Sequence, residues 1–469
     1  MLTYDIDSIK DMPLYEGLYR FIQKDIVQGK IKVHEKLPSK RRLAAHLNIS
    51  VTTVENAYGQ LMTEGYIHSE QGRGFFVNEI GNMMGVMADE DLTERKMPYI
   101  PPEEEEEEYL VDFASNIADL SLFPFSTWSR LMRDILSGNN RELLKTVPYN
   151  GIYPLRKALA DLLKSYRNMQ VNPEQIIIGA GTEYLYGRIL QLFGPGTVIA
   201  LEEPGYKKLA DLSQNREISW EYLSVYDKSH ERMKKSKADI VHVSPANHFP
   251  TGIPMPVNVR MDLLEWAQAR KGHYIIEDDY DSEIRYSGRA VPTLYTMDDK
   301  EKVIYLNTFS KSLIPSIRIS YLILPPALLE KYRKTLSFYS CTSSSFEQLV
   351  LARFISEGYF ERHINRLKMN YREKRDELLA AIEHSSLAGR VKVSENNVGT
   401  HFQMKVDTQM SDEEIKRQAA RHGMKLKMLS DYENIRQPEN AGTLVINYAG
   451  VPKERLKLAV QILESAFSK

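Results

Sequence analysis

The sequence predicts a chain of the α/β class with two domains, a small winged helix-turn-helix over residues 1–80 and a larger domain with a mainly parallel sheet over residues 111–469. The 469 residues exceed the roughly 150 of a typical domain. Short helical patterns fill the first part, whereas apolar strands alternate with helical patterns from Tyr109 onward. Residues 81–110 contain prolines and six consecutive glutamates, which predicts a solvated linker.

Composition limits the functions that the chain can have. Its hydrophobic fraction of 42% and charged fraction of 26% are typical of a soluble globular protein. A net charge of −2 provides no overall attraction for nucleic acid, so any basic surface must be local. Cys341 is the only cysteine, which excludes an internal disulfide and favours a reducing compartment. We find no signal peptide and no apolar stretch of roughly 20 residues, and we expect a cytoplasmic protein without a membrane partner.

The first domain begins with an amphipathic helix. Apolar residues recur at helical spacing over residues 13–28, and Gly29 ends the pattern. After a short turn, Ser39 can cap a second helix over residues 40–47.

A second pair of signals completes this domain. Asn48 and Ser50 indicate a tight turn into a helix over residues 51–65, so two short helices are joined by a few polar residues. Residues 66–77 predict two short strands around the turn at 71–74. This order of elements is that of a winged helix-turn-helix.

Charge indicates what such a domain can bind. The first 80 residues contain ten lysines and arginines and ten acids, so the domain is neutral as a whole. Lys40, Arg41 and Arg42 nevertheless stand together without an acid between residues 37 and 54, and Arg73 lies at the tip of the wing. This predicts phosphate contacts, with the second helix of the pair in the major groove. The alternative is a helical protein-interaction module.

The stretch LPSKRRLAAHLNISVTTVENAYGQLMTEGYI, followed by GRGFFV, resembles the winged DNA-binding domain of GntR-type bacterial regulators. The resemblance implies that the partner is a double-stranded DNA operator. It implies that seven residues face the DNA, the last of them toward the minor groove: Lys40, Arg41, Ser50, Thr52, Thr53, Asn56 and Arg73. Many members have arginine where this chain has Val51 and Glu55, so we expect an unfamiliar operator with less direct base readout.

Polar residues follow the predicted strands of the second domain. The strand at 175–179 leads through Gly181 and Thr182 into a helix, whose free amides and dipole favour a phosphate. The next strand, 197–201, is followed by Tyr206, an aromatic ring that can stack on a flat cofactor.

A third strand ends in the acidic segment EDDYDSE. Asp278 and Tyr280 stand at its carboxyl end, the edge where ligands bind in open α/β sheets. A carboxylate there can keep a pyridine nitrogen protonated, and a tyrosine hydroxyl can bond a phenolic oxygen. The alternative for these residues is a solvated loop.

Residues 303–324 predict two buried strands joined by a polar loop that carries Lys311. Burial disfavours an ammonium and lowers its pKa, which makes Lys311 a candidate nucleophile for a Schiff base. Thr308, Ser310 and Arg318 are suited to a phosphate group. A carbonyl cofactor that carries phosphate is pyridoxal 5'-phosphate. The alternative is a surface lysine in a loop. We predict no metal site.

Residues 112–467 are similar to a fold-type I aminotransferase in the motifs GAGTEYLY, EEPGY, FPTG, EDDYDSE and TFSKSLIPSIRISY. A GntR-like head joined by a linker to such a body resembles the MocR subfamily, of which GABA-responsive regulators are the familiar type. The resemblance implies an internal aldimine on Lys311, with Asp278 facing the pyridine nitrogen, Tyr280 bonding the phenolic oxygen and Tyr206 stacking on the ring. The residues implied to hold the phosphate are Gly181, Thr182, Thr308, Ser310 and Arg318.

The same resemblance implies a head-to-tail homodimer, in which Tyr149 reaches the neighbouring subunit. A dimer also suits the reading of two half-sites. Before FPTG many members have serine, histidine and glutamine, whereas this chain has Ala246, Asn247 and His248. The resemblance implies that one of these, with Asn247 as our candidate, approaches the ring oxygen. Asp431 stands where an arginine for a substrate carboxylate is expected, and Arg436 could replace it only in a differently folded loop.

Three functions are compatible with these features. The first is a regulator that senses a small amine, an amino acid or pyridoxal phosphate itself through aldimine exchange at Lys311. The second is an active aminotransferase with a DNA-binding head, which Asp431 argues against because catalysis needs an aligned substrate. The third is a regulator with a vestigial cofactor site, which the intact set of Lys311, Asp278 and Tyr280 argues against.

Overall fold

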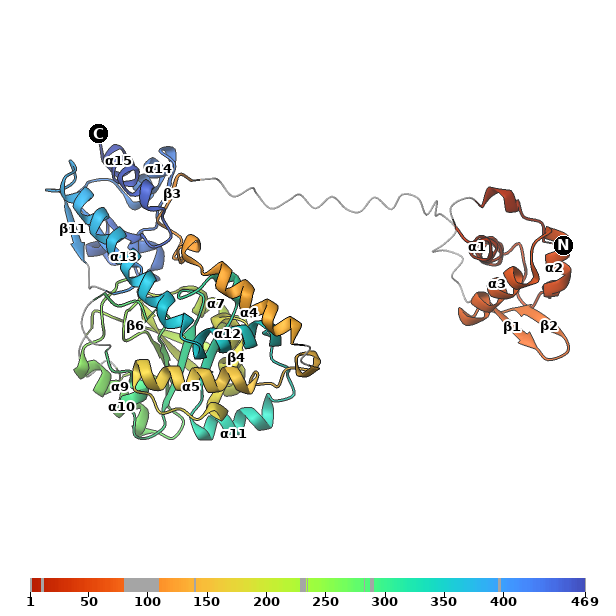
Figure 1. Cartoon of the computed structure of the whole chain (residues 1–469), viewed down its shortest axis with the longest axis horizontal. Coiled ribbons are helices and arrows are strands. Elements are labelled where there is room, and N and C mark those ends of the chain that lie inside the picture. Colours follow the sequence, from red (N-terminus) through yellow and green to blue (C-terminus); the bar gives the residue numbers. More distant parts are fainter. Residues whose placement is uncertain are drawn as a thin grey trace. The chain divides into compact units, whose positions relative to one another are not determined.

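The computed structural model divides the chain into two compact units, Met1–Glu106 and Glu107–Lys469 (Figure 1). Most of the predicted linker at 81–110, including its glutamate run, lies outside the described residues. The residues that the structure describes are 2–9, 12–79, 109–138, 141–227, 233, 235–281, 283–286, 291–394 and 398–468.

The first unit has the predicted winged helix-turn-helix layout. Its elements are α1 (Leu14–Val27), α2 (Lys40–Leu47), α3 (Val51–Thr63) and the antiparallel hairpin of β1 (Ile67–Glu70) and β2 (Gly74–Val77). The Ser39 hydroxyl accepts a hydrogen bond from the Arg42 amide at 3.3 Å, and the Ser50 hydroxyl accepts one from the Thr53 amide at 3.0 Å. Asn48 takes the left-handed conformation between the helices, with a φ of 55°. Ser39 and Ser50 thus cap the starts of α2 and α3, and Asn48 ends α2 at the turn between them.

The second unit is built on a seven-stranded sheet in the order β4-β10-β9-β8-β7-β5-β6. β10 is antiparallel to both of its neighbours, and the other pairs are parallel, which confirms the mainly parallel sheet. The strands are β4 (Ile176–Gly179), β5 (Val198–Glu203), β6 (Ser219–Ser224), β7 (Ile240–Val243), β8 (Tyr274–Asp278), β9 (Val303–Thr308) and β10 (Ser320–Ile323).

Helices cover both faces of this sheet. Apolar residues of α6 (Thr182–Phe193), α7 (Lys208–Gln214) and α11 (Pro326–Thr335) pack in one core on the first face. The helices whose buried residues join the cores on the other side are α4 (Phe125–Ser137), α5 (Tyr153–Arg167), α9 (Val257–Ala269), α10 (Leu294–Met297), α12 (Ser345–Ser356) and α13 (Tyr359–Glu383).

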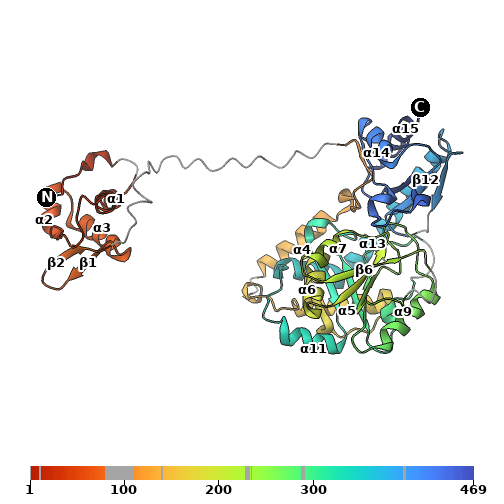
Figure 2. The same ribbon diagram turned by 180° about the vertical axis from the view of Figure 1, so that it is seen from behind.

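A smaller part follows α13. It contains a three-stranded antiparallel sheet, β11 (Val391–Ser394), β12 (His401–Val406) and β14 (Thr443–Asn447), with α14 (Asp412–Arg421) and α15 (Leu456–Phe467) nearby (Figure 2). β3 (Val111–Asp112), which begins the unit, pairs in parallel with β13 (Met424–Lys425). The start of the second unit is therefore tied to its carboxyl-terminal part.

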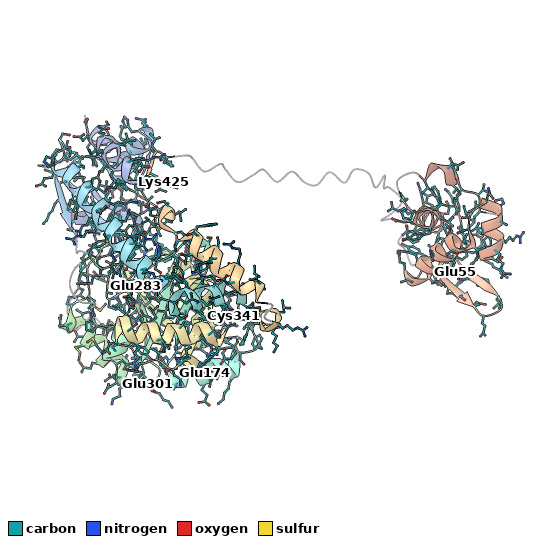
Figure 3. The ribbon with its side chains drawn as sticks, in the orientation of Figure 1. Glu55, Glu174, Glu283, Glu301, Cys341 and Lys425 are labelled. Atoms are coloured by element: carbon teal, nitrogen blue, oxygen red, sulfur yellow. The ribbon has the colours of Figure 1, made fainter. Side chains whose placement is uncertain are left out.

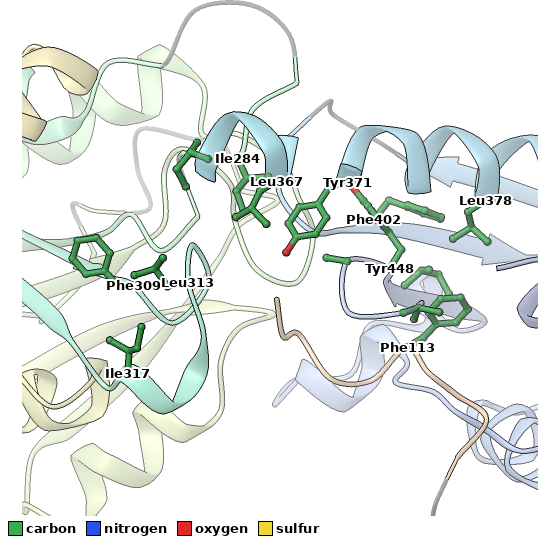
Figure 4. Packing of buried hydrophobic residues seen from close by; sticks show 14 of the residues in the cluster. Phe113, Ile284, Phe309, Leu313, Ile317, Leu367, Tyr371, Leu378, Phe402 and Tyr448 are labelled. Carbon is green, nitrogen blue, oxygen red and sulfur yellow. The ribbon is translucent and has the colours of Figure 1, made fainter. Parts of the chain in front are cut away.

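One apolar core joins the large sheet to the smaller part. Figure 4 shows it running from Phe309 and Leu313, in the β9–β10 loop that also carries Lys311, past Leu367 and Tyr371 of α13 to Phe402 of β12. Buried side chains of this core therefore hold the loop that carries Lys311, and they fix its position relative to the large sheet and to the smaller part. Within the described residues no helix is long and apolar enough to cross a membrane.

Candidate functional site

A cavity of about 430 Å³ lies where β5, β7, β8 and β9 end. This is the edge at which parallel sheets bind ligands, and the volume suits a small organic molecule. Eight of the ten predicted cofactor residues line it: Thr182, Tyr206, Asp278, Tyr280, Thr308, Ser310, Lys311 and Arg318. The other two are next to lining residues: Gly181 lies against the Arg318 guanidinium, and Asn247 is hydrogen-bonded to Tyr280.

Lys311 carries the reactive amine of this cavity. Its Nζ donates a hydrogen bond to the backbone carbonyl oxygen of Asn116. Burial lowers the pKa of Lys311 to about 8, although the carboxyl groups of Asp281 and Asp278 oppose this shift. The amine therefore loses its proton far more readily than an exposed lysine, as the sequence analysis predicted.

Asp278 ends β8 and faces the same cavity. Burial, followed by the charge of Asp279, raises the pKa of Asp278 to about 7. The His242 ring lies beneath it, with Nε2 3.7 Å from Asp278 Oδ2. Among the described residues Asp278 Oδ1 has no hydrogen-bond partner, although it is buried. A protonated pyridine nitrogen would satisfy this oxygen, so the site fits the ring of pyridoxal phosphate.

Tyr280 presents a hydroxyl on the wall of the cavity. Asn247 Nδ2 donates to this hydroxyl at 3.3 Å and to Asp281 Oδ2 at 2.7 Å. Burial raises the pKa of Tyr280 well above its ordinary value, so the hydroxyl keeps its proton and can donate. Asn247 touches Tyr280 and does not itself line the cavity.

The other end of the cavity suits an anion. Gly181 begins α6 with a φ of 98°, and a Cβ there would lie 2.4 Å from Nη2 of Arg318. The guanidinium therefore occupies space that a side chain would take. Thr308 Oγ1 donates to Ser310 Oγ at 3.1 Å, so two hydroxyls lie side by side near this cation. Backbone amides at the start of α6, hydroxyls and an arginine are together a suitable phosphate site.

The unexpected acid, Asp431, does not line the cavity, although Tyr432 beside it does. Asp431 Oδ1 accepts from Lys416 Nζ at 2.7 Å, and Oδ2 accepts from the Met428 amide at 2.8 Å. Arg436 is exposed and does not line the cavity. Neither residue can act there as a carboxylate clamp in this structure. Tyr149 also lies outside the cavity, where its hydroxyl accepts from Arg333 Nε at 3.1 Å.

Sequence reasoning missed several residues that line the cavity. Asn116 and Lys427 reach it from segments far from Lys311 in the chain, and no local pattern marks them. His242 had a signal, because it is a polar residue inside the apolar strand β7. Tyr432 and Phe249 also line the cavity, with ring centroids 5.1 Å apart.

The first unit exposes a second candidate surface, on α2, α3 and the hairpin. Arg41, Thr52 and Asn56 are exposed, whereas Ser50 and Thr53 are engaged with each other in the cap of α3. Lys40 Nζ lies 2.6 Å from Oε1 of Glu55, an acid whose place in the first unit Figure 3 shows.

Arg73 lies in the turn between β1 and β2, 2.5 Å from Glu70 Oε2 and over the Phe76 ring. Both Lys40 and Arg73 thus have acidic partners within the first unit.

Family models match both units. The model described as "Aminotransferase class I and II" matches residues 109–463, and "Bacterial regulatory proteins, gntR family" matches residues 14–77. The chain is 37% identical to the uncharacterized HTH-type transcriptional regulator YdeL of Bacillus subtilis, over 99% of each chain. It is 30% identical to the probable rhizopine catabolism regulatory protein MocR of Rhizobium meliloti, over 100% of this chain and 96% of the relative.

Solved structures support the fold of the second unit. A kynurenine aminotransferase from Pyrococcus horikoshii superposes with a TM-score of 0.67 at 23% identity, covering 77% of this chain and 91% of the enzyme. A multiple-substrate aminotransferase from Thermococcus profundus gives a TM-score of 0.68 at 24% identity, covering 78% and 92%. Both likenesses are to the fold.

Proposed function

Because the chain belongs to the class I and II aminotransferase family and joins that domain to a gntR-type head, as in the MocR-like HTH-type regulators, we propose that it is a transcriptional regulator that senses an amine through pyridoxal phosphate. The observation that carries the proposal is the cavity where Lys311, Asp278 and Tyr280 meet. The aminotransferase fold family implies the cofactor, and the orphaned Asp278 oxygen and the anion site around Arg318 fit it.

When bound, pyridoxal phosphate supplies an aldehyde carbon that bonds reversibly to primary amines. Lys311 is the amine that would hold it, since its lowered pKa leaves more of it neutral. Asp278 would keep the ring nitrogen protonated, and the Tyr280 hydroxyl would donate to the ring oxygen. Thr182, Thr308, Ser310 and Arg318 would bind the phosphate, while Tyr206 would cover the ring. A small amine that enters the cavity would compete with the Lys311 amine for the same position.

We extend the proposal to the DNA and to the assembly. The head, residues 1–80, binds a double-stranded operator through α3 and the wing, and residues 81–110 link it to the body at 111–469. The chain acts in the cytoplasm as a head-to-tail homodimer, because two heads can then read two half-sites. One relative is a pyridoxine biosynthesis transcriptional regulator of Corynebacterium glutamicum, 28% identical over 76% of this chain and 75% of the relative, which supports pyridoxal phosphate itself as a second effector candidate.

The test is an absorption titration of the purified full chain with pyridoxal phosphate. Wild-type protein should develop a protein-bound visible band that changes when an effector amine is added. Lys311→Ala should lose the band while keeping its fold, and Lys453→Ala, an exposed lysine outside the cavity, should keep it. A Lys311→Ala variant with the same band would refute the assignment.

The second candidate, an active aminotransferase, is favoured by the complete set of Lys311, Asp278 and Tyr280. It is opposed by Asp431, whose carboxylate is occupied by Lys416 and the Met428 amide. Accumulation of keto acid beyond one equivalent per cofactor would establish it. A single equivalent, or none, is expected for the regulator.

A further inference from the structure

Four cations line the cavity, and two of them have no role in the proposed function. Lys311 and Arg318 are assigned to the carbonyl and the phosphate of the cofactor, which leaves Lys207 and Lys427. Within the described part of the chain neither of these two lysines has a carboxylate within ion-pair distance. A pair of uncompensated cations beside a small cavity favours an anionic ligand group.

Lys427 lines the same cavity as the residue that accepts a hydrogen bond from the Lys311 amine. Lys311 donates to the carbonyl of Asn116, and Asn116, Ala114 and Lys427 line the cavity. The start of this segment is joined to β13, because the Phe113 amide donates to the Lys425 carbonyl at 3.0 Å. Segment 113–116 therefore connects the reactive amine with the strand that precedes Lys427.

The backbone of Lys427 is held in place as well. The Val445 amide donates to its carbonyl at 3.0 Å, which ties it to the buried strand β14. Its Nζ lies 5.5 Å from the centroid of the Tyr432 ring, another part of the cavity lining. The side chain of Lys427 thus reaches the cavity from a backbone that is held in place by β14.

Three acids in or near the cavity lining have other partners, whereas Asp278 is assigned to the ring nitrogen of the cofactor. Asp431, four residues along, binds Lys416 and the Met428 amide. Glu183 lies 2.5 Å from Lys208, and Glu202 accepts from the Ser244 amide at 2.9 Å with His248 Nε2 3.6 Å away. The charge of Lys427 therefore remains available for a ligand.

We propose that the effector is an amine that also carries an anionic group such as a carboxylate, and that Lys427 binds this group while the amine reacts at the Lys311 position. The inference rests on the proposed function, because it uses the same cavity. Lys427, which lies between β13 and β14, would then bind the anionic group that Asp431 and Arg436 cannot bind. Lys207, which follows the stacking Tyr206, is the competing candidate.

The test compares matched ligands on the full chain loaded with pyridoxal phosphate. Short straight-chain amino acids are titrated beside the corresponding amino amides, which keep the amine and remove the charge. The change of the visible band gives an affinity for each ligand. A charge-assisted hydrogen bond contributes about 1.5–3 kcal/mol, so wild-type protein should prefer an acid over its amide by about 10- to 100-fold.

Four substitutions, the last of them Lys207→Gln, distinguish the outcomes. Lys427→Gln should remove the preference for the acid and leave the affinity for the amide unchanged, whereas Lys427→Arg should retain the preference. Lys425→Gln is the matched control, an exposed lysine two residues earlier on β13 that does not line the cavity (Figure 3).

Equal affinity for acids and amides in the wild type would overturn the inference. So would loss of the preference in Lys207→Gln but not in Lys427→Gln. In both cases amines still change the band, so the proposed function stands. A band that no amine changes would overturn the proposed function, and this inference with it.

Discussion

Lys311 shows how burial alone prepares a side chain for chemistry. Its amine is enclosed between the ends of two buried strands, and burial lowers its pKa to about 8 against the partial compensation of Asp281 and Asp278. Asp278 changes in the opposite direction, with its pKa raised to about 7. An amine that readily becomes neutral and an acid that is costly to ionise lie in one cavity, and a cationic ring would stabilise the acid.

The lowered pKa predicts how cofactor capture depends on pH. Only the neutral amine attacks an aldehyde, and its fraction increases as pH rises through the pKa of about 8. Below that value the rate of band formation should rise about tenfold per pH unit and then level off. Stopped-flow absorbance with the apoprotein measures this rate. A rate that keeps rising toward pH 10.5, the ordinary lysine value, would contradict the assigned environment.

Asp278→Asn should weaken cofactor binding by about 10- to 100-fold, because it replaces a charge-assisted hydrogen bond of about 1.5–3 kcal/mol with a neutral one. Equilibrium dialysis against pyridoxal phosphate measures the change. His242→Gln removes the ring beneath Asp278 and should have a smaller effect in the same direction. Unchanged affinity in Asp278→Asn would place the ring nitrogen elsewhere.

For the helices and strands, the spacing of apolar residues and the capping residues predicted most of the fold. Ser39 and Ser50 cap α2 and α3 as expected, and the strand ends bring Asp278 and Lys311 together. The sequence could not reveal what tertiary packing alone creates. Asn116 and Lys311 are hydrogen-bonded although they are 195 positions apart in the chain. No local pattern around Asn116 predicts such a contact.

The expected carboxylate clamp illustrates the same limit. The sequence showed an acid in place of an arginine, but not where that acid would point. The structure turns Asp431 toward Lys416 and the Met428 amide, and Lys427 lines the cavity in its stead. Local spacing identified the segment, whereas the direction of its side chains depended on how β14 holds it.

The exposed basic residues of the first unit predict how its affinity for DNA depends on salt concentration. Arg41 is exposed at the start of α2, where it would neutralise one phosphate. Arg41→Ala should weaken binding to all DNA sequences about equally and reduce the slope of log affinity against log salt by about 1. Arg20→Ala, on α1 and paired with Glu16, is the control and should change neither. A sequence-selective loss would instead identify Arg41 as a base reader.

A buried ion pair holds the segment that follows β3. Lys374 on α13 is 1% exposed, and its Nζ lies 2.6 Å from Asp119 Oδ2 and 2.9 Å from the Ala449 carbonyl. Asp119→Ala leaves this ammonium buried without its carboxylate and should lower the free energy of unfolding by about 3–5 kcal/mol. Urea unfolding of the second unit measures it. The double variant Asp119→Leu with Lys374→Met should recover part of the loss, and equal losses in both would refute the pair's role.

At the scale of the whole molecule, two units with different chemistry share one chain. The first offers a local basic surface on an otherwise neutral domain, and the second offers a cavity whose residues fit pyridoxal phosphate. A regulator requires these two functions to be coupled, and coupling requires that the effector bind two states of the protein with different affinity. In the proposed function, loss of the contact between Lys311 and Asn116, in the segment that follows the linker, would offer one physical origin for two states.

If the chain senses an amine at Lys311, binding of that amine must change the affinity of the chain for DNA. The measurement is one titration of the full chain, loaded with pyridoxal phosphate and bound to a labelled fragment from upstream of its own gene, in which the visible band and DNA binding are followed together as an amine is added. We expect both signals to change over the same range of amine concentration, and we expect Lys311→Ala to bind DNA but no longer to respond. A band that changes fully while DNA binding stays constant would show that the amine site is not coupled to DNA binding.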